Sequence, residues 1–134
     1  MNRHPECNIF NHNILIEDCY VDNLTTRIGD FDNLEVFIIT DDVVQIPHIH
    51  IRNTRKSKYF SCCIRLDKPE YIPHNNKLDK LNYTQLKAFI KFLNATDKYT
   101  CLPIYESILC HWNDNNYLYQ IRETTPMPDY MQLK

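Results

Sequence analysis

The stretch QIPHIHIR, residues 45–52, sets isoleucines and polar side chains at alternating positions. Alternation with a period of two is typical of a β-strand whose two faces meet different surroundings. It places His48, His50 and Arg52 on one face and Ile49 and Ile51 on the other. The stretch therefore predicts a strand whose polar face is either a functional site or a solvated sheet surface.

Further strands are predicted on both sides of this one. LEVFIITDD, residues 34–42, is the kind of β-branched and aromatic run that forms a central strand. Pro47 lacks a backbone N–H, so it belongs at a strand start or an edge. A basic, turn-like link then joins residues 48–52 to a strand over 59–66, which predicts a hairpin, and residues 7–22 also contain short strand-like runs.

The second half of the chain changes to a helical period. In LNYTQLKAFIKFLNA, residues 81–95, Asn82 is in the N-cap position and Gln85 completes a capping box. Apolar residues recur on one side of this predicted helix, namely Leu86, Phe89, Ile90 and Leu93.

A second helix is predicted to begin around Pro103 and to end at Asn115 and Asn116. Strands followed by helices indicate one α+β domain, with a mostly antiparallel sheet in the first half and two C-terminal helices packed on one face. The residues from about 123 to 134 are predicted to form an extended and flexible C-terminal arm. The inward-facing residues of the second helix are expected to be Tyr105, Ile108, Leu109 and Trp112.

Composition excludes several functional classes. The 134 residues contain one glycine, Gly29, whereas phosphate-loop and dinucleotide-binding folds need several glycines around the phosphates. We therefore expect no such cofactor. Six cysteines without a Cys-x-x-Cys pair, no leader segment and no long apolar run predict a reduced, soluble, cytoplasmic protein that does not enter a membrane.

Charge is distributed unevenly along the chain. Residues 1–45 have a balance of −7, residues 46–134 a balance of +5, and the segment 52–91 alone a balance of +7. This split permits nucleic-acid binding through the basic segment or neutralisation of one half by the other within the fold. We favour neutralisation, because the pI of about 6.3 lacks the strongly basic balance of nucleic-acid-binding modules.

The two histidines of the opening strand are the main candidate site. Both imidazoles project the same way, and a third ligand would complete a metal centre that lowers the pKa of bound water. Alternatively, the two histidines would act as acid and base without a metal. We nevertheless expect the histidines to lie on a solvated sheet face or in a hydrogen-bonded polar patch. The candidate catalytic residues are His48, His50, Arg52 and Arg65, and the candidate metal ligands are His48, His50, His74, Asp67 and Glu70.

One resemblance to an enzyme family is excluded by the residues themselves. Gln45, His48 and His50 are similar to part of the motif of the histidine-triad nucleotide hydrolases. Arg52, however, stands where that motif has its third histidine, and the glycine needed around the phosphate is absent. We therefore do not expect nucleotide hydrolysis of this type.

Residues 47–50, Pro-His-Ile-His, together with the strand CCIRLDKPEYI, a helix over 81–93 and the Trp112-Asn113 pair, carry another resemblance. Over about residues 34–116 the chain resembles a family of small bacterial domains of unknown function centred on a Pro-His-x-His strand. The resemblance implies a toxin–antitoxin-type or accessory protein of a bacterium or mobile element. It implies no catalytic residues.

Two classes of function follow from the sequence. The first is a non-enzymatic accessory protein, able to form homo-oligomers, that binds a protein partner through a sheet edge or through Tyr117, Tyr119 and Tyr130. The alternative is a small metal- or histidine-dependent nuclease or phosphoesterase that uses His48 and His50, with Arg52 or Arg65 holding a phosphate.

Overall fold

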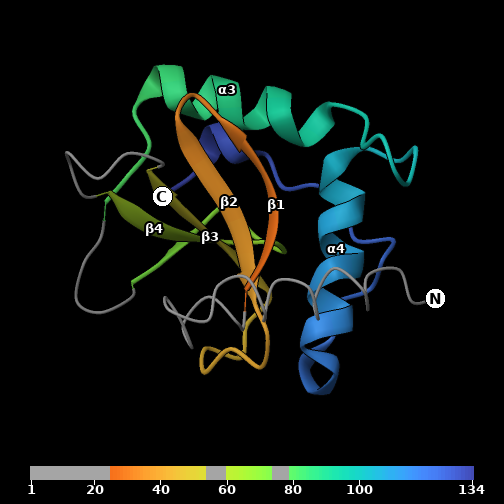
Figure 1. The fold of residues 1–134 in the computed structure, drawn as a ribbon. Coiled ribbons are helices and arrows are strands. Elements are labelled where there is room, and N and C mark those ends of the chain that lie inside the picture. Colours follow the sequence, from red (N-terminus) through yellow and green to blue (C-terminus); the bar gives the residue numbers. More distant parts are fainter. Residues whose placement is uncertain (1–24, 54–59, 74–78) are drawn as a thin grey trace, which may run out of the picture.

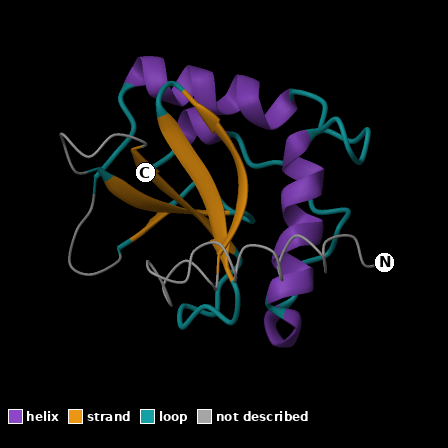
Figure 2. Ribbon diagram, in the orientation of Figure 1, coloured by secondary structure: helices purple, strands orange, loops and turns teal. Residues whose placement is uncertain are grey.

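The protein is described by a computed structural model over residues 25–53, 60–73 and 79–134. A five-stranded antiparallel sheet, in the order β1-β2-β3-β4-β5, forms its centre (Figures 1 and 2). The strands predicted within residues 7–22 lie outside the described residues. The strands are β1 (Thr25–Phe31), β2 (Leu34–Ile39), β3 (His48–Asn53), β4 (Ser61–Arg65) and β5 (Tyr71–Ile72).

Two helices follow the sheet, which confirms the predicted α+β fold. Helix α3 (Tyr83–Asn94) lies across one end of the β1–β2 hairpin, and α4 (Ile104–Asn115) runs crosswise to α3 along the side of the sheet (Figure 1). Two short 3-10 helices, η1 (Tyr117–Tyr119) and η2 (Tyr130–Gln132), complete the described chain. Within the described residues, no helix has the length and apolar character needed to cross a membrane.

Both helix boundaries agree with the signals in the sequence. The Asn82 side chain accepts from the Gln85 N–H at 2.8 Å, and the Gln85 side chain accepts from the Asn82 N–H at 2.9 Å. This reciprocal pair is the predicted capping box, which satisfies N–H groups that have no partner within the helix. Pro103 is the N-cap of α4, and Asn116 follows its last residue.

The predicted hairpin is also confirmed, and the structure supplies its register, which the sequence left open. Strands β3 and β4 are antiparallel, and His48 is paired with Arg65 while His50 is paired with Cys63. Side chains of paired residues lie on the same face of a sheet. The register therefore sets His48, His50, Cys63 and Arg65 on one face and leaves the isoleucines of β3 on the other.

The isoleucine face of the sheet forms an apolar core with the two helices. Gly29 lies at an irregularity in the β1–β2 pairing, where a Cβ atom would come within 2.9 Å of the Phe92 ring of α3. The one glycine of the chain thus permits the close approach of α3 to β1. The buried members of this apolar core include Val36, Ile38, Ile49, Ile51, Ile64, Phe89, Leu93, Ile108, Leu109 and Trp112.

The C-terminal segment, predicted as an extended arm, lies against the sheet over its last residues. Tyr130 of η2 is buried, and its hydroxyl donates to the Arg65 carbonyl at 2.5 Å. The Tyr71 N–H donates to the Lys134 carbonyl, and the Lys134 N–H donates to the Pro69 carbonyl. Residues 130–134 therefore add to the core and to the β5 side of the sheet.

Candidate functional site

Four chemically active side chains meet where the β2–β3 loop joins β3, and we call them the polar cluster: Asp42, His48, His50 and Cys63. His48 is fully buried, and the other three are at most 7% exposed. The His50 ring stacks on Phe37 with centroids 5.2 Å apart, while the His48 ring contacts Trp112 of α4 at 5.4 Å. The expectation that these histidines lie on a solvated face is therefore wrong. The alternative that we kept beside it, a hydrogen-bonded polar patch, describes what is found.

Three ligand atoms of the polar cluster converge. Asp42 Oδ2 lies 2.7 Å from His50 Nε2 and 3.1 Å from His48 Nε2, and the two Nε2 atoms are 3.1 Å apart. On the outer sides of the rings, His48 Nδ1 lies 2.5 Å from the Ile46 carbonyl oxygen and His50 Nδ1 lies 3.3 Å from Cys63 Sγ. Each imidazole is thus held at both nitrogens, which fixes its orientation.

The hydrogen-bond partners of each imidazole nitrogen show which nitrogens of the polar cluster carry a hydrogen. A carbonyl oxygen only accepts, so His48 Nδ1 carries a hydrogen, and in the neutral ring its Nε2 has a lone pair. An ionised carboxylate also only accepts, so His50 Nε2 donates to Asp42. His48 Nε2 and Asp42 Oδ2 then face each other at 3.1 Å as two acceptors. The His50 Nε2–H also lies 3.1 Å from His48 Nε2 and can be shared with its lone pair, and a metal ion between the three atoms would take the place of this shared hydrogen.

The surroundings of Asp42 and Cys63 fix their charge. Burial acts to raise the pKa of Asp42, but interactions with His48, His50 and the Val44 N–H outweigh it and hold this pKa well below its usual range. Burial, and secondarily the Asp42 carboxylate, raises the pKa of the Cys63 thiol to about 12. At neutral pH the polar cluster therefore contains one carboxylate and a protonated thiol.

Distant parts of the chain hold Asp42 in place. Its backbone N–H donates to Asn116 Oδ1 at 2.9 Å, and the Asp41 N–H donates to the Asn115 carbonyl at 2.9 Å. Asp41 has a φ of 51°, a left-handed conformation that aspartate tolerates better than most residues. The β2–β3 loop lies at the same end of the molecule as the C-terminus of α4 (Figure 2). The end of α4 thus directs the carboxylate towards the histidines.

The remaining candidate residues are engaged elsewhere. Arg52 binds Glu35 at 2.9 Å and lies over the Phe37 ring, and Arg65 binds Asp67 at 2.8 Å with Glu70 at 3.7 Å. Asp67 and Glu70 are therefore partners of Arg65, and neither belongs to the group of ligand atoms that the described residues bring together at His48, His50 and Cys63. The Arg52–Glu35 pair also joins the basic segment to the acidic one, as neutralisation predicts. His74 lies outside the described residues.

Sequence reasoning found the two histidines but missed Asp42. The predicted hairpin left open which residues of β4 lie beside them, and the register places Cys63 opposite His50. A signal for Asp42 was present: the loop after β2 must return to the start of β3, and its second and third residues are aspartates. Which of the two carboxylates turns inwards depends on contacts more than 70 residues away.

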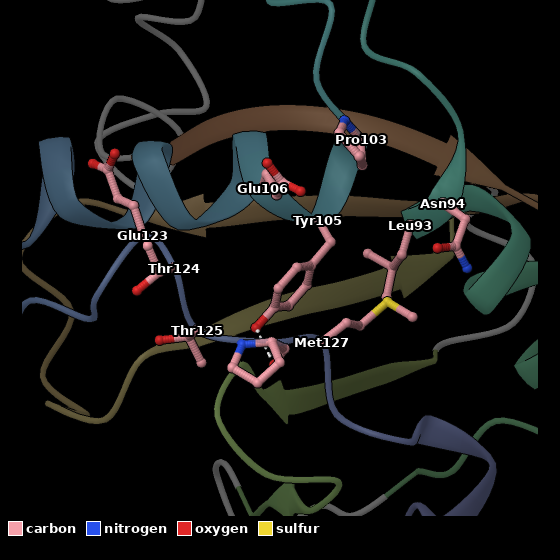
Figure 3. A pocket seen from close by; sticks show the side chains of 10 residues that line it. Leu93, Asn94, Pro103, Tyr105, Glu106, Glu123, Thr124, Thr125 and Met127 are labelled. Carbon is pink, nitrogen blue, oxygen red and sulfur yellow. Dashed lines mark hydrogen bonds between the residues drawn. The ribbon is translucent and has the colours of Figure 1, made fainter.

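A separate pocket of about 320 Å³ lies between the end of α3, the start of α4 and residues 123–127. Figure 3 shows Glu123 and Thr124 at one end of it, Leu93 and Met127 at the other, and Tyr105 between them. The Tyr105 hydroxyl donates to the carbonyls of Leu66 and Pro126. Tyr105 therefore holds these segments together, and the polar cluster remains the better candidate site.

The chain matches no family model, no curated protein sequence and no solved structure. The resemblance to the Pro-His-x-His domains consequently stays a prediction.

Proposed function

We propose that the chain is a non-enzymatic intracellular accessory protein that binds a protein partner through one exposed apolar surface. This aromatic surface consists of Val43 in the β2–β3 loop and of Tyr117, Leu118 and Tyr119 in η1. Val43 is 85% exposed, Leu118 71% and Tyr117 70%. Large apolar side chains grouped in this way are typical of protein interaction sites.

Two hydrogen bonds between the β2–β3 loop and the end of α4 support this grouping. Asp41 donates to the Asn115 carbonyl, and the Asp42 N–H donates to the Asn116 side chain, so the residues next to Val43 are bound to those next to Tyr117. These bonds bring the two segments side by side although 74 positions separate them in the chain. Tyr130, the third tyrosine that the sequence suggests for partner binding, is buried and does not belong to the aromatic surface.

The charges around the aromatic surface suggest the chemistry of the partner. Asp41, in the same loop as Val43, and Asp114, three residues before Tyr117 in α4, are both exposed. A partner with an apolar centre, acceptors for the tyrosine hydroxyls and basic side chains at its rim would be complementary. A protein partner of this kind is therefore favoured over nucleic acid, whose phosphates would face these carboxylates.

The burial of the two histidines supports a non-enzymatic function over a nuclease or phosphoesterase. A nuclease or phosphoesterase must bring substrate to its acid and base, whereas His48 is fully buried and His50 is 5% exposed. Of the arginines proposed to hold phosphate, Arg52 binds Glu35 and Arg65 binds Asp67. The intracellular location is supported by the free thiols of Cys62, Cys63 and Cys101.

The experiment replaces two members of the aromatic surface together, as Val43→Ser/Leu118→Ser. Tyr99→Ser, at a 91% exposed position in the loop between α3 and α4, is the matched control. A partner captured by the wild type and then purified should bind the double variant roughly 30-fold or more weakly, since two apolar side chains lose their burial. The control should bind as the wild type does.

Two results would overturn the proposal. One is a wild-type chain that captures no saturable partner, and the other is a partner that binds the double variant as tightly as the wild type. Sedimentation of the purified chain decides whether the partner is a second copy. Self-association that the double variant abolishes would identify it as such.

A further inference from the structure

We infer that the polar cluster is a metal centre, in which Asp42, His48 and His50 bind one divalent first-row transition ion. This inference is independent of the proposed partner binding. It reverses our expectation from the sequence that the histidines bind no metal.

The distances among the three ligand atoms fit such an ion. Asp42 Oδ2, His48 Nε2 and His50 Nε2 form a triangle with sides of 2.7, 3.1 and 3.1 Å. A point about 2.0–2.2 Å from all three atoms exists, because the circle through them has a radius of only about 1.7 Å. Ligands around a metal at that distance are separated by about 3.0–3.4 Å. An expansion of a few tenths of an ångström therefore suffices.

The hydrogen bonding also favours a cation at this point. The His48 Nδ1–H donates to the Ile46 carbonyl, which leaves the Nε2 lone pair directed at the carboxylate. An imidazole fixed in this way by a backbone carbonyl is typical of histidine metal ligands. A divalent ion would satisfy the Asp42 oxygen and both lone pairs at once.

Binding needs only a tautomer change at His50. Its hydrogen moves from Nε2 to Nδ1, where Cys63 Sγ at 3.3 Å can accept it. Cys63 then supports His50 from outside the ligand set and does not itself bind the ion.

The ligand types select the class of metal. Two imidazoles and one carboxylate suit zinc, iron, cobalt or nickel, whereas calcium and magnesium prefer oxygen ligands throughout. All three ligands are buried, which favours a centre that holds structure over one that meets substrate. The ion would fix the β2–β3 loop, which carries Asp42, to β3, which carries both histidines.

The test uses the full chain, stripped of metal by a chelator and titrated with Zn²⁺. One ion per chain should bind with a Kd below about 1 μM, and zinc at 100 times the Kd should raise the Tm by roughly 10 °C. Asp42→Asn and His50→Gln should each weaken binding by about 100-fold or more. Cys63→Ser should weaken it by less than about 10-fold. His111→Gln, which changes another buried histidine, is the matched control and should bind as the wild type does.

A measurement on the wild-type protein alone decides the matter if the variants do not fold. X-ray absorption at the zinc edge should show two imidazoles with only oxygen beside them. A sulfur ligand would mean that Cys63 and not Asp42 binds the ion, which would overturn the assignment. A folded wild-type chain that binds no stoichiometric zinc would also overturn it, and so would Asp42→Asn and His50→Gln variants that bind zinc as tightly as the wild type.

Discussion

The apolar core under α3 and the polar cluster at the β2–β3 loop are both buried, but different interactions stabilise them. In the core, Phe89 packs against Phe31 and Tyr130 with ring centroids 5.4 and 5.3 Å apart, and its contribution depends on filled volume. In the polar cluster each side chain depends on its specific hydrogen-bond partners. The comparison teaches that a core residue is replaceable by another of its size, whereas a polar residue is replaceable only if its partners stay satisfied.

The largest effect is expected from a cavity in the apolar core. Phe89→Ala should lower the free energy of unfolding by about 3–5 kcal/mol, because the fully buried ring leaves a space that the sheet and helices cannot fill. Urea unfolding followed by circular dichroism measures the change. Tyr83→Ala, an exposed aromatic position on the same helix, should change stability by no more than about 0.5 kcal/mol. A loss below about 1 kcal/mol for Phe89→Ala would show that this core is loosely packed.

A smaller effect is expected where only hydrogen bonds are removed beside the polar cluster. Asn116 is buried, accepts from the Asp42 N–H and donates to the Ile39 carbonyl. Asn116→Ala should therefore cost about 2 kcal/mol, because two backbone groups lose their partner. Asn94→Ala removes a bond of the same kind to the Ile90 carbonyl at an exposed position and should cost far less. Equal losses for the two variants would contradict the difference drawn between the regions.

The smallest effect is expected at Tyr105. Its ring packs in the apolar core, whereas its hydroxyl depends on specific partners, the carbonyls of Leu66 and Pro126. Tyr105→Phe keeps the ring and should cost about 1 kcal/mol at neutral pH. Burial, with a lesser effect of Asp67, raises the pKa of Tyr105 from 10.0 to about 12.

Because the pKa of Tyr105 is raised, Tyr105→Phe should change how the free energy of unfolding depends on pH above pH 10. Between pH 10 and 12 the unfolded chain loses the Tyr105 proton while the folded chain keeps it, so stability falls as the pH rises. The stabilising effect of Tyr105 is thus complete below pH 10 and is lost as the pH approaches 12. Unfolding measured across this range should give a shallower decline for Tyr105→Phe than for the wild type. Identical slopes would mean that the hydroxyl is not shielded from water.

Local chemistry made much of the fold predictable. The capping box of Asn82 and Gln85 lies within four residues, and the β3–β4 hairpin follows from two short patterns joined by a turn. The candidate site was only half predictable. The alternation in β3 brings His48 and His50 to one face, but Asp42 reaches them through the left-handed Asp41 and through Asn115 and Asn116. Such long-range contacts leave no periodic pattern in a sequence.

The pairing of residue Lys134 with the outer side of β5 also affects self-assembly. The edge of a sheet offers unpaired N–H and carbonyl groups to which a strand of another molecule can add, and this is a common route to aggregation. Here the Tyr71 N–H and the Pro69 carbonyl are already bonded to Lys134. The chain's own backbone thus occupies the β5 edge at Tyr71 and Pro69, where an added strand would otherwise pair.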